Sequence, residues 1–131
     1  MSMTAAEVLG TMYQRMGEQD WEGVMAMMTE DFKVIEPDSL PYGGVWEGKD
    51  AMQRLYPAVV SHFDVFSPVI KEVIGGIKWE EVVVDLPIVT KQTGKRLKKT
   101  VTEMGYIREG KVAELQIHYF DTAQILSLIH I

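Results

Sequence analysis

One short segment, EPDSLPYGGVWEG at residues 36–48, combines carboxylates with large aromatic side chains. Glu36 and Asp38 flank a proline, while Tyr42 and Trp46 flank a pair of glycines. Proline and glycine set turns, so we expect an irregular loop whose side chains converge on one place. A partly buried carboxylate has a raised pKa and can act as a general base. Glu36 is therefore the candidate base, whereas Asp38 is better explained as a turn residue.

The composition is that of an ordinary globular chain. Its 131 residues match the length of one domain, predicted to span 1–131, and 47% of them are hydrophobic. A formal net charge of −6 argues against nucleic acid as a partner. Because the chain has no cysteine, disulfides and Cys-ligated zinc are excluded. Neither a signal-peptide pattern nor an apolar run long enough for a membrane is present, so we expect a cytoplasmic protein.

Three helices are predicted in the N-terminal half of the chain. The capping-box sequence TAAE at 4–7 precedes apolar residues that recur at helical intervals until Gly17. Asp20 can cap a short second helix. Helical spacing of apolar residues returns from 49 to about 62, where Pro57 predicts a kink that divides the helix.

The C-terminal half has the pattern of an antiparallel meander. A short strand at 31–37 comes before the third helix, and three β-branched segments follow it at 82–91, 99–107 and 111–120. Turns that contain glycine separate these segments. A last short helix follows. This order predicts an α+β fold with helices on one face of a strongly bent sheet, which three helices would fill incompletely, so a pocket is expected.

The same order resembles the nuclear transport factor 2-like superfamily, in particular its branch of polyketide cyclases (SnoaL-like) and steroid-isomerase-like proteins. The resemblance is carried by DWEGVMAMMTEDFKVIEP, GKDAMQRLY and GKVAELQIHYFDTAQIL, at 20–37, 48–56 and 110–126. It implies a cone-shaped α+β barrel, with three N-terminal helices packed on a strongly bent antiparallel sheet. Members include isomerases, cyclases, dehydratases, epoxide hydrolases and proteins without chemistry, so the fold alone does not give the activity.

The resemblance also implies roles for individual residues. In steroid-isomerase-like members, an acid followed by proline at the end of the first strand is the general base, and Glu36 matches that position. Tyr56 matches a supporting tyrosine on the third helix. Tyr119 matches an inward-facing residue of the last strand, and Trp46 would shield the site from the rim.

Two positions depart from the isomerase pattern. The tyrosine that would hold an oxyanion falls on Met12, with Tyr13 one residue away and about 100° around the helix. The strand acid that would assist it falls on Thr102, and strand alternation places Glu103 on the opposite face. Tyr13 and Thr102 are therefore candidate substrate contacts, and the oxyanion hole is predicted to be absent. Its loss would argue against a true steroid isomerase.

Two further carboxylates are candidate pocket residues. Asp85 stands inside an apolar strand, where it either faces water or is paired within the pocket. Asp121 has the strand parity of the inward row, although a helix cap explains it equally well. No metal site is predicted, because no ligand spacing relates the three histidines, His62, His118 and His130. No cofactor is predicted either, since the sequence has no phosphate loop or dinucleotide glycine pattern.

These residues predict a small-molecule pocket protein that acts as a cofactor-independent acid/base enzyme of isomerase, cyclase or dehydratase type. Its substrate would be a hydrophobic ring or enolisable carbonyl compound. Glu36 would move the proton while Tyr56 and Tyr119 bind the ring. The alternative is a non-catalytic ligand-binding or dimeric interaction module, in which Glu36 is a solvated strand end. A homodimer through the convex sheet face is also expected, from the outward polar row Glu114, Gln116 and His118.

Overall fold

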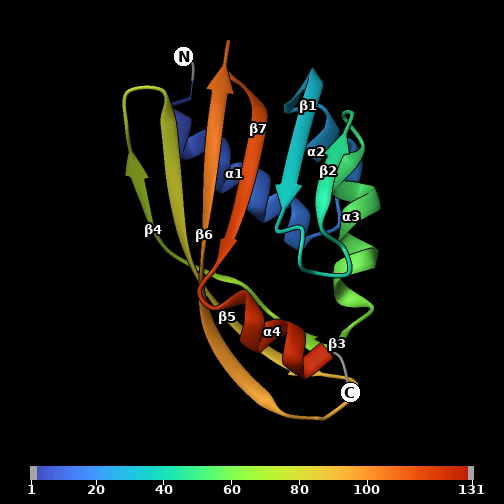
Figure 1. Cartoon of the computed structure of the whole chain (residues 1–131). Helices are drawn as coiled ribbons and strands as arrows, with labels where there is room; N and C mark the ends of the chain where they lie inside the picture. The colour runs from blue at the N-terminus through green and yellow to red at the C-terminus, as the bar shows by residue number, and fades with distance from the viewer. Residues whose placement is uncertain (1–2, 130–131) are drawn as a thin grey trace.

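A computed structural model describes residues 3–129 (Figure 1). Its elements in chain order are α1 (Ala5–Gly17), α2 (Trp21–Met25), β1 (Met28–Glu36), β2 (Gly44–Glu47), α3 (Ala51–Val60), β3 (Phe63–Phe66), β4 (Val69–Gly75), β5 (Trp79–Thr90), β6 (Arg96–Arg108), β7 (Lys111–Tyr119) and α4 (Thr122–Ile129). His130, one of the three histidines considered above, lies outside the described residues. Within 3–129 no helix has the length and apolar character needed to cross a membrane.

The seven strands form one sheet in the order β2-β1-β7-β6-β5-β3, and β4 also pairs with β5. The predicted α+β fold on a bent sheet is confirmed, but the sheet is not wholly antiparallel, because β1 and β7 run parallel. These two strands come from distant parts of the chain. A hairpin does not join them, so their relative direction is set by the path of the whole chain.

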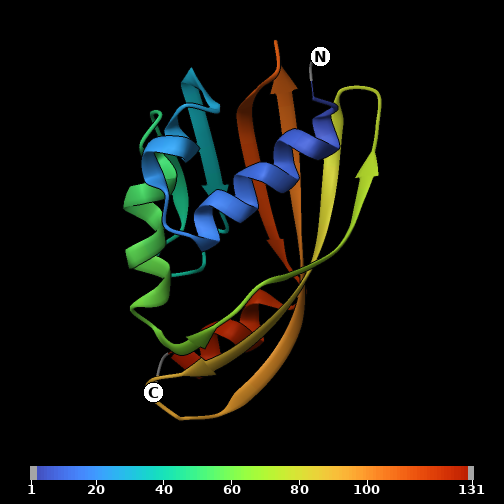
Figure 2. The ribbon, with the colours of Figure 1, turned by 180° about the vertical axis from the view of Figure 1, so that it is seen from behind.

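The sheet bends because β5 and β6 are long and curl together, with paired residues from Trp79 and Tyr106 to Val89 and Arg96. The first half of β5 pairs with β4 and the second half with β3. Figure 2 shows α1 crossing the concave side of this sheet, with α3 at one margin and α4 below. The helices therefore enclose a space against the sheet.

Helix α1 begins where the capping box predicts. The Thr4 amide donates to Glu7 Oε1 at 3.0 Å, and the Glu7 amide donates to Thr4 Oγ1 at 3.1 Å. The buried face of α1 consists of Val8, Leu9 and Met12, which anchor the helix on the sheet. Short helix α2 is capped by Asp20, as predicted. These local signals fix where α1 starts, and packing on the sheet supplies most of its stability.

The segment after β1 is less irregular than the sequence suggested. Gly44–Glu47 forms strand β2, paired antiparallel with β1, so that Gly44 lies opposite Glu36. Only the connection at 37–43 is a loop. It turns tightly enough that a Cβ on Gly43 would lie 2.2 Å from the Pro37 carbonyl oxygen, so this position requires glycine.

The predicted division of the third helix is wrong. Helix α3 is a single helix from Ala51 to Val60 that contains Pro57. The proline stands near the C-terminal end, where only one further turn remains to be disturbed, and the Ser61 amide still bonds the Pro57 carbonyl at 3.0 Å.

Candidate active site in the concave face

A cavity of about 560 Å³ opens between α1, α3 and the concave face of the sheet. Its walls are mostly apolar, and most of the apolar side chains come from α3, β5 and β7: Met52, Leu55, Val59, Val84, Leu86 and Ile117. A volume of this size accommodates a ring compound of two or three rings. The expected pocket is therefore present.

Glu36 lies in this cavity, at the end of β1. Phe32 and Val34 are buried on the same face of the strand, so strand alternation points Glu36 inward as well. The side chain is 4% exposed, and its Oε1 has no hydrogen-bond partner among the described residues. Burial, followed by the nearby charge of Glu103, raises the pKa of Glu36 to about 9. The structure thus shows a desolvated carboxyl group rather than a solvated strand end.

Glu103 shares the cavity with Glu36, and this corrects the expectation for β6. Alternation along the strand places Glu103 on the concave side, whereas Thr102 lies outside the cavity lining and pairs with the exposed His118. The match to the steroid-isomerase-like pattern was one residue out of register along β6. A shift of one residue moves a strand side chain to the other face of the sheet. Burial raises the pKa of Glu103 to about 7, and the nearby Tyr13 hydroxyl opposes this rise.

Tyr13 completes this group from helix α1. It lines the cavity, while its neighbour Met12 is fully buried in the core and does not. Burial and the proximity of Glu103 raise the pKa of Tyr13, so its hydroxyl keeps its proton. Within the described part of the chain, this buried hydroxyl has no partner at hydrogen-bonding distance. Tyr13 and Glu103 therefore both lie in the cavity, each one residue on from Met12 and Thr102, the positions to which the resemblance assigned these two groups.

Two more of the predicted tyrosines line the cavity. Tyr56 projects from α3, and its ring centroid lies 5.5 Å from that of Trp21. Tyr119 stands at the end of β7, where its hydroxyl is 3.0 Å from the hydroxyl of Tyr42 in the 37–43 loop. The inward orientation predicted for Tyr119 is confirmed, and Leu115 and Ile117 at the same strand parity are buried.

Four predicted site residues do not line the cavity: Trp46, Asp85, Thr102 and Asp121. Trp46 donates from Nε1 to the Tyr42 carbonyl at 3.1 Å and so holds the loop rather than the ligand. Asp85 lies on the outer face of β5, because its neighbours Val84 and Leu86 take the inner positions.

Polar contacts outside the cavity hold both Asp85 and Asp121. Asp85 is 3.5 Å from Lys98 and 3.9 Å from Lys71, so it is paired at the surface. Asp121 is exposed and accepts a bond from the Gln124 amide at 3.1 Å at the start of α4. The helix-cap alternative for Asp121 is therefore the one the structure supports.

Sequence reasoning missed Glu103 as a site residue. The available signal was its parity, since Val101 and Gly105 at the same parity are buried in the sheet interior. Between residues 3 and 129, no three His, Asp or Glu side chains gather closely enough to hold a metal ion. Lys, Arg and His are likewise absent from the cavity lining in this range. Its ionisable groups are thus two carboxyls and the tyrosine hydroxyls.

Comparison with known families identifies the chain. The model of the SnoaL-like domain matches residues 9–115. The chain belongs to the SnoaL-like family. None of the curated proteins compared with it matches.

Solved structures share the SnoaL-like fold at low sequence identity. An NTF2-like protein of unknown function from Burkholderia pseudomallei has a TM-score of 0.84 at 21% identity, covering 96% of this chain and 97% of its own. TerC, co-crystallized with polyporic acid, has a TM-score of 0.83 at 19% identity, with coverage of 96% and 98%. A protein named as a SnoaL-like polyketide cyclase from Mesorhizobium loti has a TM-score of 0.70 at 19% identity, with coverage of 89% and 100%. At these identities the likeness shows the cone fold alone.

Proposed function

We propose that this SnoaL-like protein is a cofactor-independent acid/base enzyme that acts on an uncharged ring compound with an enolisable carbonyl group. The observation that carries the proposal is the convergence of Glu36, Tyr13 and Glu103 in one apolar cavity. A base and two hydrogen-bond donors are what proton abstraction next to a carbonyl requires.

The cavity selects an uncharged substrate by its electrostatics. Two carboxyl groups line it, and the described lining residues include no cation. An anionic ligand would lose its hydration without gaining an ion pair, which is costly in an apolar site. The aliphatic walls from α3 and β5 instead favour a hydrophobic ring.

The proton transfer assigns one role to each polar group. Ionised Glu36 takes a proton from the carbon next to the substrate carbonyl, and the electron pair of that C–H bond moves into the carbonyl to form an enolate. The hydroxyl of Tyr13 and the protonated carboxyl of Glu103 donate to the enolate oxygen. The proton then returns from Glu36 to another carbon, which isomerises the compound. In a cyclisation the enolate carbon instead attacks a second carbonyl carbon of the same molecule, the π bond of that carbonyl breaks, and the resulting alkoxide takes the proton from Glu36.

The protonation states follow from the shared cavity. Because the pKa of Glu36 is raised to about 9, most molecules of the empty protein hold Glu36 protonated at neutral pH. The reactive state pairs ionised Glu36 with protonated Glu103, whose pKa is raised to about 7, so its population grows about tenfold per pH unit only up to about pH 7. The expected turnover rate therefore rises with pH up to about 7, stays level between about 7 and 9, and falls above about 9 as Glu103 loses the proton that it donates.

The names of two proteins with the same fold refer to small organic molecules, as the proposal does. A protein named as a SnoaL-like polyketide cyclase has the same fold, and TerC was crystallised with polyporic acid. Both names connect the cone fold to small organic molecules. Neither name assigns a substrate to this chain.

The experiment uses proton exchange, which needs no knowledge of the final product. Cyclic and aromatic ketones with α-hydrogens are incubated with the protein in deuterated buffer, and loss of the α-proton signal is followed by NMR. Replacing Glu36 by Gln keeps the shape but removes the acceptor, so exchange should fall by roughly 10²- to 10⁴-fold. The matched control is Asp38→Asn, an exposed carboxylate two residues away that should leave the rate unchanged.

Two results of this experiment would contradict the proposed function. If the parent protein exchanges no ketone of the series faster than buffer, the proposed function fails. It also fails if Glu36→Gln exchanges at the parent rate, because the base would then be another group.

A further inference from the structure

Two tyrosine hydroxyls meet at the cavity wall near Glu36. Tyr42 comes from the loop at 37–43 and Tyr119 from the end of β7, and their oxygens are 3.0 Å apart. Tyr42 is 2% exposed and stands behind the lining, whereas Tyr119 is part of the lining itself. The mechanism above does not use this pair.

The direction of the hydrogen bond follows from where each proton can go. If Tyr119 donated to Tyr42, the Tyr42 proton would be left in the protein interior, where the described residues offer its hydroxyl no partner besides Tyr119. A buried donor without an acceptor costs about 1–3 kcal/mol. If Tyr42 donates, the remaining proton belongs to Tyr119 at the cavity wall. The second arrangement is favoured, because a ligand or water in the cavity can accept that proton.

The surroundings keep both hydroxyls protonated. Burial raises the pKa of Tyr42, and the nearby Glu36 raises it further while Tyr119 opposes the rise. Burial, Glu36, Tyr42 and Glu103 all raise the pKa of Tyr119. Tyr119 is therefore a neutral donor across the range in which Glu36 titrates.

The loop holds Tyr42 firmly enough to orient its partner. Its backbone carbonyl accepts the Trp46 Nε1–H bond at 3.1 Å, and the following Gly43 amide bonds the Leu40 carbonyl at 2.9 Å. The exposed side chain of Arg54 in turn places its guanidinium 5.9 Å from the centre of the Trp46 ring. Tyr42 is thus anchored at its backbone and at its hydroxyl.

We propose that Tyr119 donates a hydrogen bond to the ligand, that Tyr42 is the positioning residue that aims this donor, and that the ligand carries an acceptor oxygen for Tyr119 in addition to its carbonyl at Tyr13. The two donors come from different walls, α1 for Tyr13 and β7 for Tyr119. The assignment of Tyr13 to the reacting carbonyl rests on the proposed function. The substrate class narrows to uncharged rings with two separate acceptor oxygens.

The test uses two rigid probes of the same shape, 9,10-anthraquinone with two opposed carbonyls and anthracene with none. Neither has an α-hydrogen to lose, so binding is measured without turnover, by quenching of tryptophan fluorescence. The readout is the ratio of the two dissociation constants, because a variant that merely loosens the fold weakens both probes alike. Melting temperatures of all variants are recorded beside it.

The expected results separate positioning from packing. Tyr119→Phe should lower the preference for anthraquinone about three- to tenfold. Tyr42→Phe should lower it by a smaller factor, because Tyr119 then keeps its hydroxyl but loses the partner that orients it. Tyr106→Phe is the matched control, a tyrosine of β6 outside the lining of this cavity, and should leave the ratio unchanged. Combined with Tyr13→Phe, the effect of Tyr119→Phe should multiply, because the two donors serve separate oxygens.

Three results would overturn the inference. An unchanged ratio in Tyr119→Phe would remove Tyr119 as a donor, and a double variant no weaker than either single one would show that both tyrosines share one oxygen. Failure of both probes to bind the parent at their solubility limits would remove the ring site. If Tyr119→Phe changes the ratio of dissociation constants but Glu36→Gln does not change the exchange rate, the proposed enzyme function is wrong and the inference about Tyr119 is still supported.

Discussion

The two faces of the sheet place the same types of residue in opposite situations. On the concave side Glu36 and Glu103 face apolar walls, and Glu36 Oε1 is without a partner in the described structure. On the convex side Glu114 lies 3.5 Å from Lys33, and Asp85 is paired with lysines. A carboxylate that water and a cation stabilise is chemically inert, whereas a desolvated one has a raised pKa and can move protons.

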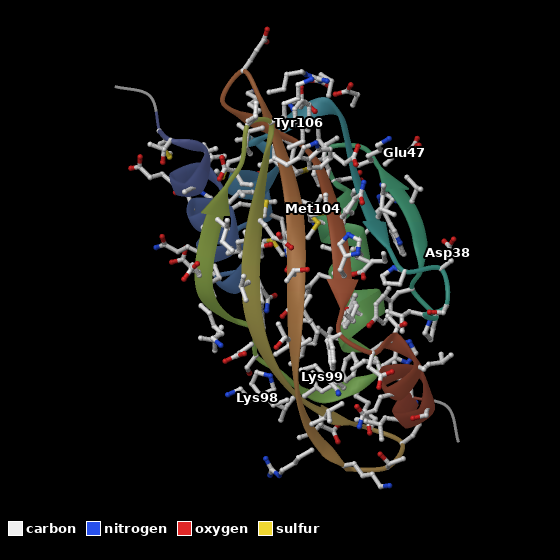
Figure 3. All side chains as sticks on the ribbon, turned by 60° about the vertical axis from the view of Figure 1, so that its left-hand side comes forward. Asp38, Glu47, Lys98, Lys99, Met104 and Tyr106 are labelled. Atoms are coloured by element: carbon white, nitrogen blue, oxygen red, sulfur yellow. The ribbon has the colours of Figure 1, made fainter. Side chains whose placement is uncertain are left out.

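The convex face also shows an uneven distribution of charge. In Figure 3, Glu47 and Tyr106 are labelled toward one end of this face, Met104 in the middle, and Lys98 and Lys99 toward the other end. The upper end holds an open groove of about 680 Å³, whose lining has four acids and two cations and is therefore acidic on balance: Glu30, Asp31, Glu47, Glu114, Lys33 and Arg108. An acidic end and a basic end on one face would complement each other in a second copy turned by a two-fold rotation.

The largest contrast between the faces should appear in turnover. Tyr13→Phe removes an oxyanion donor from the concave side and should lower the rate by about 10²- to 10³-fold. Tyr106→Phe removes a hydroxyl from the convex side and should leave the rate unchanged. The measurement is the exchange rate of the best ketone found above, and equal rates in the two variants would erase the distinction between the faces.

The next effect concerns stability and its dependence on pH. Glu36 has an ordinary pKa of 4.5 when unfolded and about 9 when folded, so the folded state binds more protons between these values. The contribution of Glu36 to the free energy of unfolding should therefore be most favourable below about pH 4.5 and fall as the pH rises toward 9. Glu36→Gln lacks this titration and should be more stable than the parent by up to about 5 kcal/mol at pH 8, with little difference at about pH 4.

Urea unfolding of parent and variant across this pH range measures the difference. Glu114→Gln serves as the convex control, because its partner Lys33 is partly exposed and such pairs contribute less than about 1 kcal/mol. Parallel stability curves for Glu36→Gln and the parent would show that Glu36 is solvated after all.

A smaller effect is expected from the concave surface of β6. A Cβ on Gly105 would lie 3.1 Å from both terminal carbons of Leu9, which is fully buried under α1. Gly105→Ala should therefore destabilise the protein by about 1–2 kcal/mol. Gly10→Ala in α1 meets nothing within 4 Å and should stabilise by about 0.5–1 kcal/mol. Equal stability of the two variants would show that α1 does not need this close approach.

The smallest effect on chemistry should come from the convex face. We propose that this face forms a homodimer that buries on the order of 800 Å² per partner. Met104→Glu should convert the dimer to a monomer while turnover per chain stays within about twofold, since the cavity lies on the other side of the sheet. Light scattering measures the mass, and a parent protein that is monomeric at about 50 μM would contradict the proposal.

Part of the candidate site could be predicted from sequence because it depends on local rules. Glu36 follows two inward residues at strand alternation, and Tyr119 ends a strand with the same clear alternation. For Thr102 and Glu103 the same rule failed, because β6 was placed one residue out of register. Trp46 was misplaced for a different reason, since the strand pairing of β2 turns its indole toward the Tyr42 backbone.

The sequence by itself determined the helix starts, the turns, the strand alternation and the membership of an α+β cone fold, because capping, glycine conformations and hydrophobic periodicity act between residues close in the chain. Only the tertiary structure decided that Glu36, Glu103 and Tyr13 share one dry cavity, and that β1 pairs parallel with β7. These relations join residues up to ninety positions apart, and each depends on register and packing. A shift of one residue would send Glu103 to water and leave its pKa near the ordinary value.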